Sequence, residues 1–172
     1  MTAHAISVRL AGQRDMSESG LGWKYDPPRV LRAIRDRDTL AVVACEGGKS
    51  AAARGAVTGF AILELGEERA HLVLLAVRPT HRRLGIGQRL FEWLLESARV
   101  AGIASVHLEL RASNDAARRF YRAMGFYETV LVPGYYRSGE GRKEGALRML
   151  RVLRNPGPVP YSRRPPKPEV NT

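Results

Sequence analysis

Short apolar stretches dominate the first half of the chain, and they predict β-strands. Their alternating or β-branched composition is typical of strands that are half or fully buried. A short helix is predicted between the first of these strands and the others. Asp26-Pro27-Pro28 is typical of a helix start, and Val30, Leu31 and Ile34 after it give the helix one apolar face. The predicted strands cover residues 6–10, 39–45, 56–65 and 70–77.

The apolar period changes to three and four residues after Pro79, and this predicts the most secure helix of the chain. Its apolar positions are Ile86, Leu90, Phe91, Leu94, Leu95 and Ala98, and Gly102 stands where the helix would end. A strand over 106–110 follows, then a short helix that Asn114 opens and Gly125 closes, and a hairpin over 127–136 and 146–152. This order predicts an α/β fold of the mixed α+β kind, with a sheet flanked by helices.

Length and composition indicate one domain. The chain has 172 residues, 44% of them hydrophobic, which is enough for one substantial core. No apolar run is long enough to span a membrane, the opening Met1-Thr2-Ala3-His4-Ala5 lacks the regions of a secretory signal, and the lone Cys45 has no internal disulfide partner. We therefore expect a cytoplasmic protein, a monomer or homodimer, with its domain over residues 1–153.

The formal net charge of +11 permits an anionic partner. Such a partner could be a phosphorylated cofactor, an acidic peptide or a nucleic acid. Part of the excess belongs to residues 154–172, where arginine and lysine alternate with prolines and Tyr161 is the one aromatic residue. We interpret this segment as a solvated basic, proline-rich tail, and we expect neither a nucleic-acid nor a membrane partner.

The segment that joins the strand over 70–77 to the main helix contains two glycines, Gly85 and Gly87. Glycines allow a ligand to approach the backbone, while the free N–H groups and the dipole of a helix N-terminus favour an anion. From these features alone, a pyrophosphate site and an ordinary tight turn are both open.

Two motifs resemble the GNAT superfamily of acyl-CoA-dependent N-acyltransferases. Arg82, Gly85 and Gly87 match the pyrophosphate loop of that family, in which Gln or Arg is followed by two residues, Gly, one residue, and Gly or Ala. The stretch Glu109-Leu110-Arg111-Ala112-Ser113-Asn114, continued by Ala117, Phe120, Tyr121 and Gly125-Phe126, is similar to the family's second cofactor motif. The resemblance implies the GNAT fold, with a mostly antiparallel central sheet, and acetyl-CoA as the cofactor.

The resemblance also implies which residues hold the cofactor. The backbone of the preceding strand would follow the pantetheine arm and polarise the thioester carbonyl, as an oxyanion device does. The glycine loop would surround the pyrophosphate, and two residues of the second motif would contact the cofactor from the far side. These cofactor-binding residues are Leu75, Ala76 and Val77 of the strand, Arg82, Arg83, Leu84, Gly85, Ile86, Gly87 and Gln88 of the loop, and Asn114 and Tyr121.

Glu109 is the candidate general base. Alternation along its strand places it with His107 on the face opposite the leucines. An ammonium acceptor must lose a proton before it attacks, and a carboxylate can take that proton directly or through a water. The ribosomal-protein alanine acetyltransferases of the family carry a catalytic glutamate at the matching position. The alternative is a solvent-facing strand carboxylate.

Tyr121 occupies the general-acid position of the family, seven residues after Asn114. A phenol of pKa about 10 protonates a thiolate of conjugate-acid pKa about 8.5 only where that thiolate is poorly solvated, so the role follows from the resemblance. The alternative is an aromatic residue that packs beside Phe120. Cys45 has no recognisable histidine partner nearby, which favours direct transfer over an acyl-cysteine intermediate.

The resemblance is strongest to protein N-terminal acetyltransferases of the ribosomal-protein alanine type, and it implies a peptide or protein N-terminus as the acceptor. Tyr135 and Tyr136 then become peptide-binding candidates, although a hairpin with β-preferring aromatics explains them equally well. Trp23 and Tyr25 belong to the segment that would shape the amine pocket.

Two other functions stay open, a small-molecule amine acetyltransferase and a non-catalytic acyl-CoA sensor. A strongly basic protein should repel polycationic amines, which favours peptides. The histidines at 71, 81 and 107 show no metal-ligand spacing with a cysteine, so we expect no metal.

Overall fold

The computed structural model describes residues 6–11, 27–47, 55–137 and 143–154. The strands are β1 (Ile6–Leu10), β2 (Thr39–Glu46), β3 (Ala56–Leu65), β4 (Arg69–Val77), β5 (Ser105–Arg111), β6 (Tyr127–Arg137) and β7 (Lys143–Val152). The helices are α2 (Pro27–Arg35), α3 (Ile86–Val100) and α4 (Asp115–Ala123), with a 3-10 turn at Pro79–His81. The predicted elements are confirmed, most of them within one or two residues at each end.

The described strands form one seven-stranded sheet in the order β1-β2-β3-β4-β5-β7-β6. Every neighbouring pair is antiparallel except β4 and β5, which are parallel and are connected through α3. This arrangement confirms the prediction of a mixed, mostly antiparallel sheet. The parallel pair requires a crossover, and the long helix after β4 supplies it.

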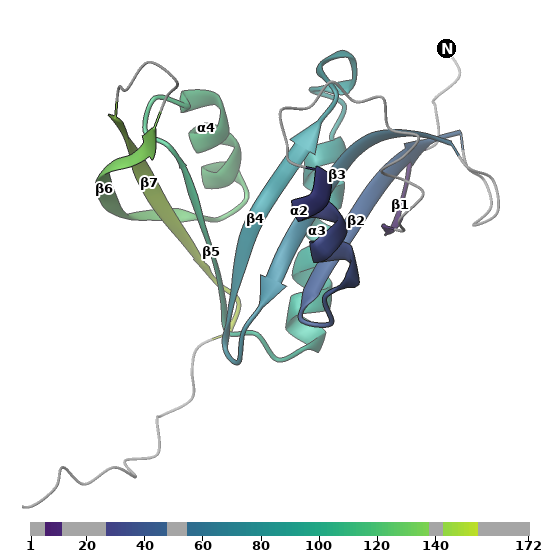
Figure 1. Cartoon of the computed structure of the whole chain (residues 1–172), viewed down its shortest axis with the longest axis horizontal. Coiled ribbons are helices and arrows are strands. Elements are labelled where there is room, and N and C mark those ends of the chain that lie inside the picture. The colour runs from purple at the N-terminus through teal and green to yellow at the C-terminus, as the bar shows by residue number, and fades with distance from the viewer. Residues whose placement is uncertain (1–5, 12–26, 48–54, 138–142, 155–172) are drawn as a thin grey trace, which may run out of the picture.

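The parallel strands β4 and β5 are joined over a short distance only. Their pairs are Arg69 with Ser105, Ala70 with Val106, and His71 with His107. Beyond these pairs the described residues of the two strands share no register, and Figure 1 shows the strands separating there. The sheet is therefore split in its middle, where both strands have a backbone edge that faces the other without bonding to it.

Helices cover both faces of the sheet. Leu90, Phe91 and Leu94 of α3 are fully buried in a core cluster that also contains Leu108 of β5. Val30 of α2 belongs to a second cluster on the opposite face. Figure 1 accordingly shows α2 and α3 on opposite sides of β2 and β3.

Some sequence predictions lie outside the described residues. Trp23 and Tyr25 belong to this group, as does almost all of the predicted tail, so both interpretations stay predictions. The last described strand, β7, ends at Val152, close to the predicted domain limit. In the part of the chain that the structure describes, no helix combines the length and the apolar character needed to cross a membrane.

Candidate active site

The turn before α3 contains two residues in the left-handed backbone conformation. Gly85 has φ 76° and lies at the N-cap of the helix, and Arg83 has φ 66°, a left-handed conformation uncommon for a residue with a side chain. The N-cap makes no side-chain hydrogen bond to the helix, and the first turn carries no acidic residue. The N-terminal amides and the positive end of the α3 dipole thus remain for a ligand.

The residues of the loop differ in their exposure and their contacts. Arg82, Arg83 and Leu84 are exposed, and Arg82 Nε donates to the Val77 carbonyl at 3.3 Å. A Cβ on Gly87 would lie 3.5 Å from Phe120 and 3.6 Å from Leu75, so this glycine faces protein rather than open space. The second glycine thus allows close packing between the start of α3, β4 and α4.

The predicted pantetheine strand is the free edge of β4. On one side Leu75, Ala76 and Val77 pair with β3, at Ala61, Phe60 and Gly59. On the other side they face the split from β5, where no register joins the two strands in the described structure. Backbone groups on this edge can therefore bond to an extended ligand as a neighbouring strand would.

The two residues predicted on the far side of the cofactor both belong to α4. Asn114 is the N-cap of α4, and its side-chain oxygen accepts the Ala117 N–H at 3.1 Å. Tyr121 is 9% exposed, with its ring edge-on to Phe120 and Phe126 at centroid distances of 5.1 and 5.6 Å. Capping and packing account for part of each residue's role, and their contacts with the cofactor stay predictions.

Glu109 is a carboxylate held on two sides. Its side chain is only 7% exposed, yet Oε2 lies 2.8 Å from His71 Nε2 and Oε1 accepts from Arg148 Nε at 2.7 Å. Burial by itself would raise the pKa of Glu109, but the Arg148 hydrogen bond and the charge and hydrogen bond of His71 outweigh burial and lower it. Arg148 and His71 therefore favour the ionised form of Glu109, and its role as the general base stays a prediction.

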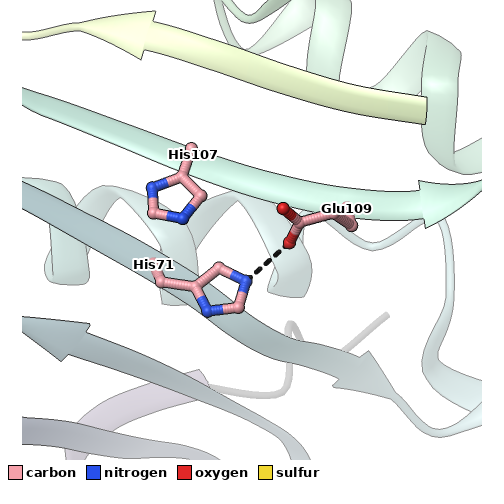
Figure 2. A group of neighbouring side chains, drawn as sticks. All are labelled: His71, His107 and Glu109. Atoms are coloured by element: carbon pink, nitrogen blue, oxygen red, sulfur yellow. Dashed lines mark hydrogen bonds and ion pairs between the residues drawn. The ribbon is translucent and has the colours of Figure 1, made fainter. Parts of the chain in front are cut away.

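The sequence did not predict that His71 and His107 would be neighbours of Glu109. The two imidazole rings stack, with centroids 4.6 Å apart and planes 5° from parallel (Figure 2). Burial, followed by the positive charge of His71, lowers the pKa of His107. Paired residues of two adjacent parallel strands point to the same face of the sheet. The sequence alone could not use this rule, because it does not show that His71 pairs with His107.

The terminal hairpin contributes a second group beside Glu109. Tyr136 donates its phenol hydrogen to the Glu109 carbonyl at 3.3 Å, and the Arg111 guanidinium lies 4.6 Å from the centre of its ring. Burial, together with the nearby Tyr135 and Glu109, raises the pKa of Tyr136. Tyr135 is 50% exposed, with its ring centre 5.0 Å from that of Tyr136. The tyrosine pair therefore borders the candidate base, and Tyr135 is the more exposed of the two.

Glu109 and Tyr121 lie on opposite faces of the sheet. Leu108 and Leu110 point into the core cluster that contains Tyr121, whereas Glu109 alternates with them and points the other way. The candidate base and the candidate acid are therefore on different sides of β5.

Comparison with known proteins defines the class. Residues 13–126 match the Acetyltransferase (GNAT) family, and the chain belongs to this family. The match includes the glycine turn, the split strands and α4, which are the features described above.

Individual relatives are similar over part or most of the chain. The [ribosomal protein bS18]-alanine N-acetyltransferase of Escherichia coli K12 is 35% identical over 98 residues, which are 57% of this chain and 66% of the relative. Among solved structures, Ard1 from Thermoplasma volcanium is 27% identical with a TM-score of 0.72, over 88% of this chain and 99% of that chain. The yncA structure from Salmonella typhimurium, with its cofactor acetyl-CoA, shares the fold at a TM-score of 0.70 and 21% identity, over 92% and 99% of the two chains.

Proposed function

We propose that this protein transfers an acetyl group from acetyl-CoA directly to an amine, and that the amine is the N-terminal α-amino group of a protein or peptide. One observation carries the proposal. Beyond the His71 and His107 pair, β4 and β5 separate; Glu109 lies on β5 just past that pair, and Tyr121 lies in the core cluster on the other face of the sheet. Membership of the GNAT family supports it.

Acetyl-CoA would enter from the face that α3 and α4 cover. Its pyrophosphate would accept hydrogen bonds from the first-turn amides of α3 next to Gly85, where no side chain caps the helix. Its pantetheine arm would extend along the free edge of β4 at Leu75–Val77. A backbone N–H on that edge would then bond to the thioester oxygen, which gains negative charge as the amine attacks.

The amine would reach the thioester from the face of Glu109. An α-ammonium of pKa about 8 is mostly protonated at neutral pH, so the ionised carboxylate both attracts it and accepts its proton, directly or through a water. The freed nitrogen attacks the carbonyl carbon, the carbon–sulfur bond breaks, and Tyr121 gives its phenol proton to the departing CoA thiolate. The second proton leaves the nitrogen as the amide forms and restores the Tyr121 phenol through solvent, while Glu109 passes the first proton to water. The products are the acetylated amine and CoA with a free thiol.

Three features support a peptide acceptor. The bacterial relative with 35% identity is named for acetylating the alanine of a ribosomal protein, although the match spans 66% of it. Tyr135 and Tyr136 border the base, where they could contact the first residues of a peptide. The charge of +11 disfavours polycationic small amines.

The test is acetyl-CoA binding by calorimetry, followed by release of free thiol with a panel of N-terminal peptides and small amines. Binding with turnover on peptides that begin with alanine or serine is the expected result. Turnover on small amines alone would indicate a small-molecule amine acetyltransferase. Binding of acetyl-CoA without turnover of any amine would indicate an acyl-CoA sensor. Absence of acetyl-CoA binding would overturn the proposal.

A further inference from the structure

We propose that His71, His107 and Glu109 form a binding site for a divalent transition-metal ion, for which zinc is the natural probe. Each of the three offers one ligand atom, and these atoms lie within 4.8 Å of one another (Figure 2). Two imidazoles and one carboxylate are a donor set that zinc uses in proteins, with the fourth position left to water or another ligand.

The backbone holds the three residues at fixed positions. His71 and His107 are the last register pair of β4 and β5, and Glu109 follows two residues later on the same face of β5. Zinc bonds of about 2.0 to 2.2 Å place tetrahedral ligand atoms about 3.3 Å apart. The 2.8 Å contact between His71 and Glu109 would have to lengthen toward this value, and the ligand atom of His107, which lies within 4.8 Å of the other two, would have to move closer to them.

Two of the candidate ligands, Glu109 and His71, also have an outer partner of the kind that orients metal ligands. Arg148 holds Oε1 of Glu109 at 2.7 Å and leaves Oε2 for the ion. The Glu64 carboxylate lies 3.9 Å from Nδ1 of His71, behind the nitrogen that would bind. Such contacts fix which ring nitrogen is free, and they typically change metal affinity by about 10- to 100-fold.

The ion would replace the hydrogen shared by His71 and Glu109. One nitrogen of a neutral imidazole carries the ring proton, and with Nε2 on the metal this proton belongs on Nδ1, toward Glu64. The His71 side chain is 33% exposed, so the cluster is reachable from solvent. The Arg148 guanidinium opposes a second positive charge, whereas the Glu109 carboxylate, and the Glu64 carboxylate on the far side of His71, favour it.

Occupancy would have a consequence that rests on the proposed function. A metal on Oε2 removes the free oxygen through which Glu109 would accept the amine proton. Zinc would thus act as a reversible inhibitor of acetyl transfer, while the glycine turn that would hold acetyl-CoA lies outside the cluster.

The experiment measures zinc binding to the full chain, without acetyl-CoA, by competition with a chromophoric chelator. We expect one tight equivalent in the wild-type protein, weakened at least 10-fold by His71→Ala and by His107→Ala. His81→Ala is the matched control, because His81 pairs with Glu46 outside the cluster and its removal should leave the tight site intact. Circular dichroism of each variant verifies folding.

A second readout uses cobalt in place of zinc, since a tetrahedral site gives a visible absorption that free cobalt in water lacks. This absorption should appear in the wild type and the His81→Ala protein and be absent from the His107→Ala protein. Equal zinc affinity in all three histidine variants, or no tight equivalent in the wild type, would overturn the site. The acetyl transfer assay without zinc separately tests the proposed function. Unchanged turnover by zinc-saturated protein would overturn the predicted inhibition but not the zinc site.

Discussion

The imidazoles of His71 and His107 stack at 4.6 Å between ring centres, at the pair where the bonding between β4 and β5 ends. Glu109 is the next residue on the same face of β5, and its carboxylate bonds to the first of these rings. The base predicted from sequence is therefore part of a polar cluster at the opening of the sheet.

Replacing Glu109 with glutamine should lower kcat by about 100-fold or more, because the neutral amide cannot accept the amine proton. The affinity for acetyl-CoA should change little, since the residue faces away from the α3 side. Steady-state kinetics together with calorimetry separates the two effects. Glu64→Gln is the matched control, because Glu64 lies at the edge of the same cluster. If the Glu109→Gln enzyme were as active as this control, Glu109 would not be the general base.

Tyr121→Phe should lower kcat by about 100-fold while it preserves acetyl-CoA binding. The phenylalanine keeps the ring contacts with Phe120 and Phe126, so the free energy of unfolding should change by about 1 kcal/mol. Thiol release at saturating substrates and urea denaturation give the two values. Full activity in the variant would show that Tyr121 has only a packing role.

Gly87→Trp should both weaken acetyl-CoA binding and destabilise the protein. Its side chain would be forced against Phe120 and Leu75 and would push the start of α3 away from β4 and α4, at a cost of about 1 to 3 kcal/mol. Gly87→Ala is the control, because its Cβ would lie at ordinary contact distance, 3.5 Å from Phe120. Calorimetry and thermal unfolding of both variants check this, and normal binding by the tryptophan variant would contradict it.

The ion pairs of Glu128 should make stability depend on pH in acid. Arg118 contacts both carboxylate oxygens at 2.6 Å, and Arg122 contacts one of them. The hydrogen bond from Arg118 is the main cause that lowers the pKa of Glu128 in the folded state. Stability from this group is thus present above its unfolded pKa and is lost as pH falls through the folded pKa.

Glu128→Gln measures that contribution directly. Urea denaturation should show a lower free energy of unfolding for the variant than for wild type at pH 7. This difference should shrink as the pH falls below the ordinary pKa of glutamate. A difference that stays constant down to strongly acidic pH would mean that packing, not charge, stabilises this site.

The sequence by itself determined the elements and the alternation within them. The change of apolar period after Pro79 located α3, and Asn114 and Gly125 bounded α4, because helix caps and periodicity are local properties. Alternation along β5 correctly placed Glu109 and His107 on one face and the leucines on the other.

Tertiary structure decided which residues meet across elements. The register of β4 against β5 brought His71 beside His107 and Glu109, from which it is distant in the chain. The same register determined where the sheet splits. Pairing of β7 with β5 supplied Arg148, whose hydrogen bond helps to keep the buried carboxylate ionised. Such contacts depend on long-range strand pairing, which local sequence patterns do not encode.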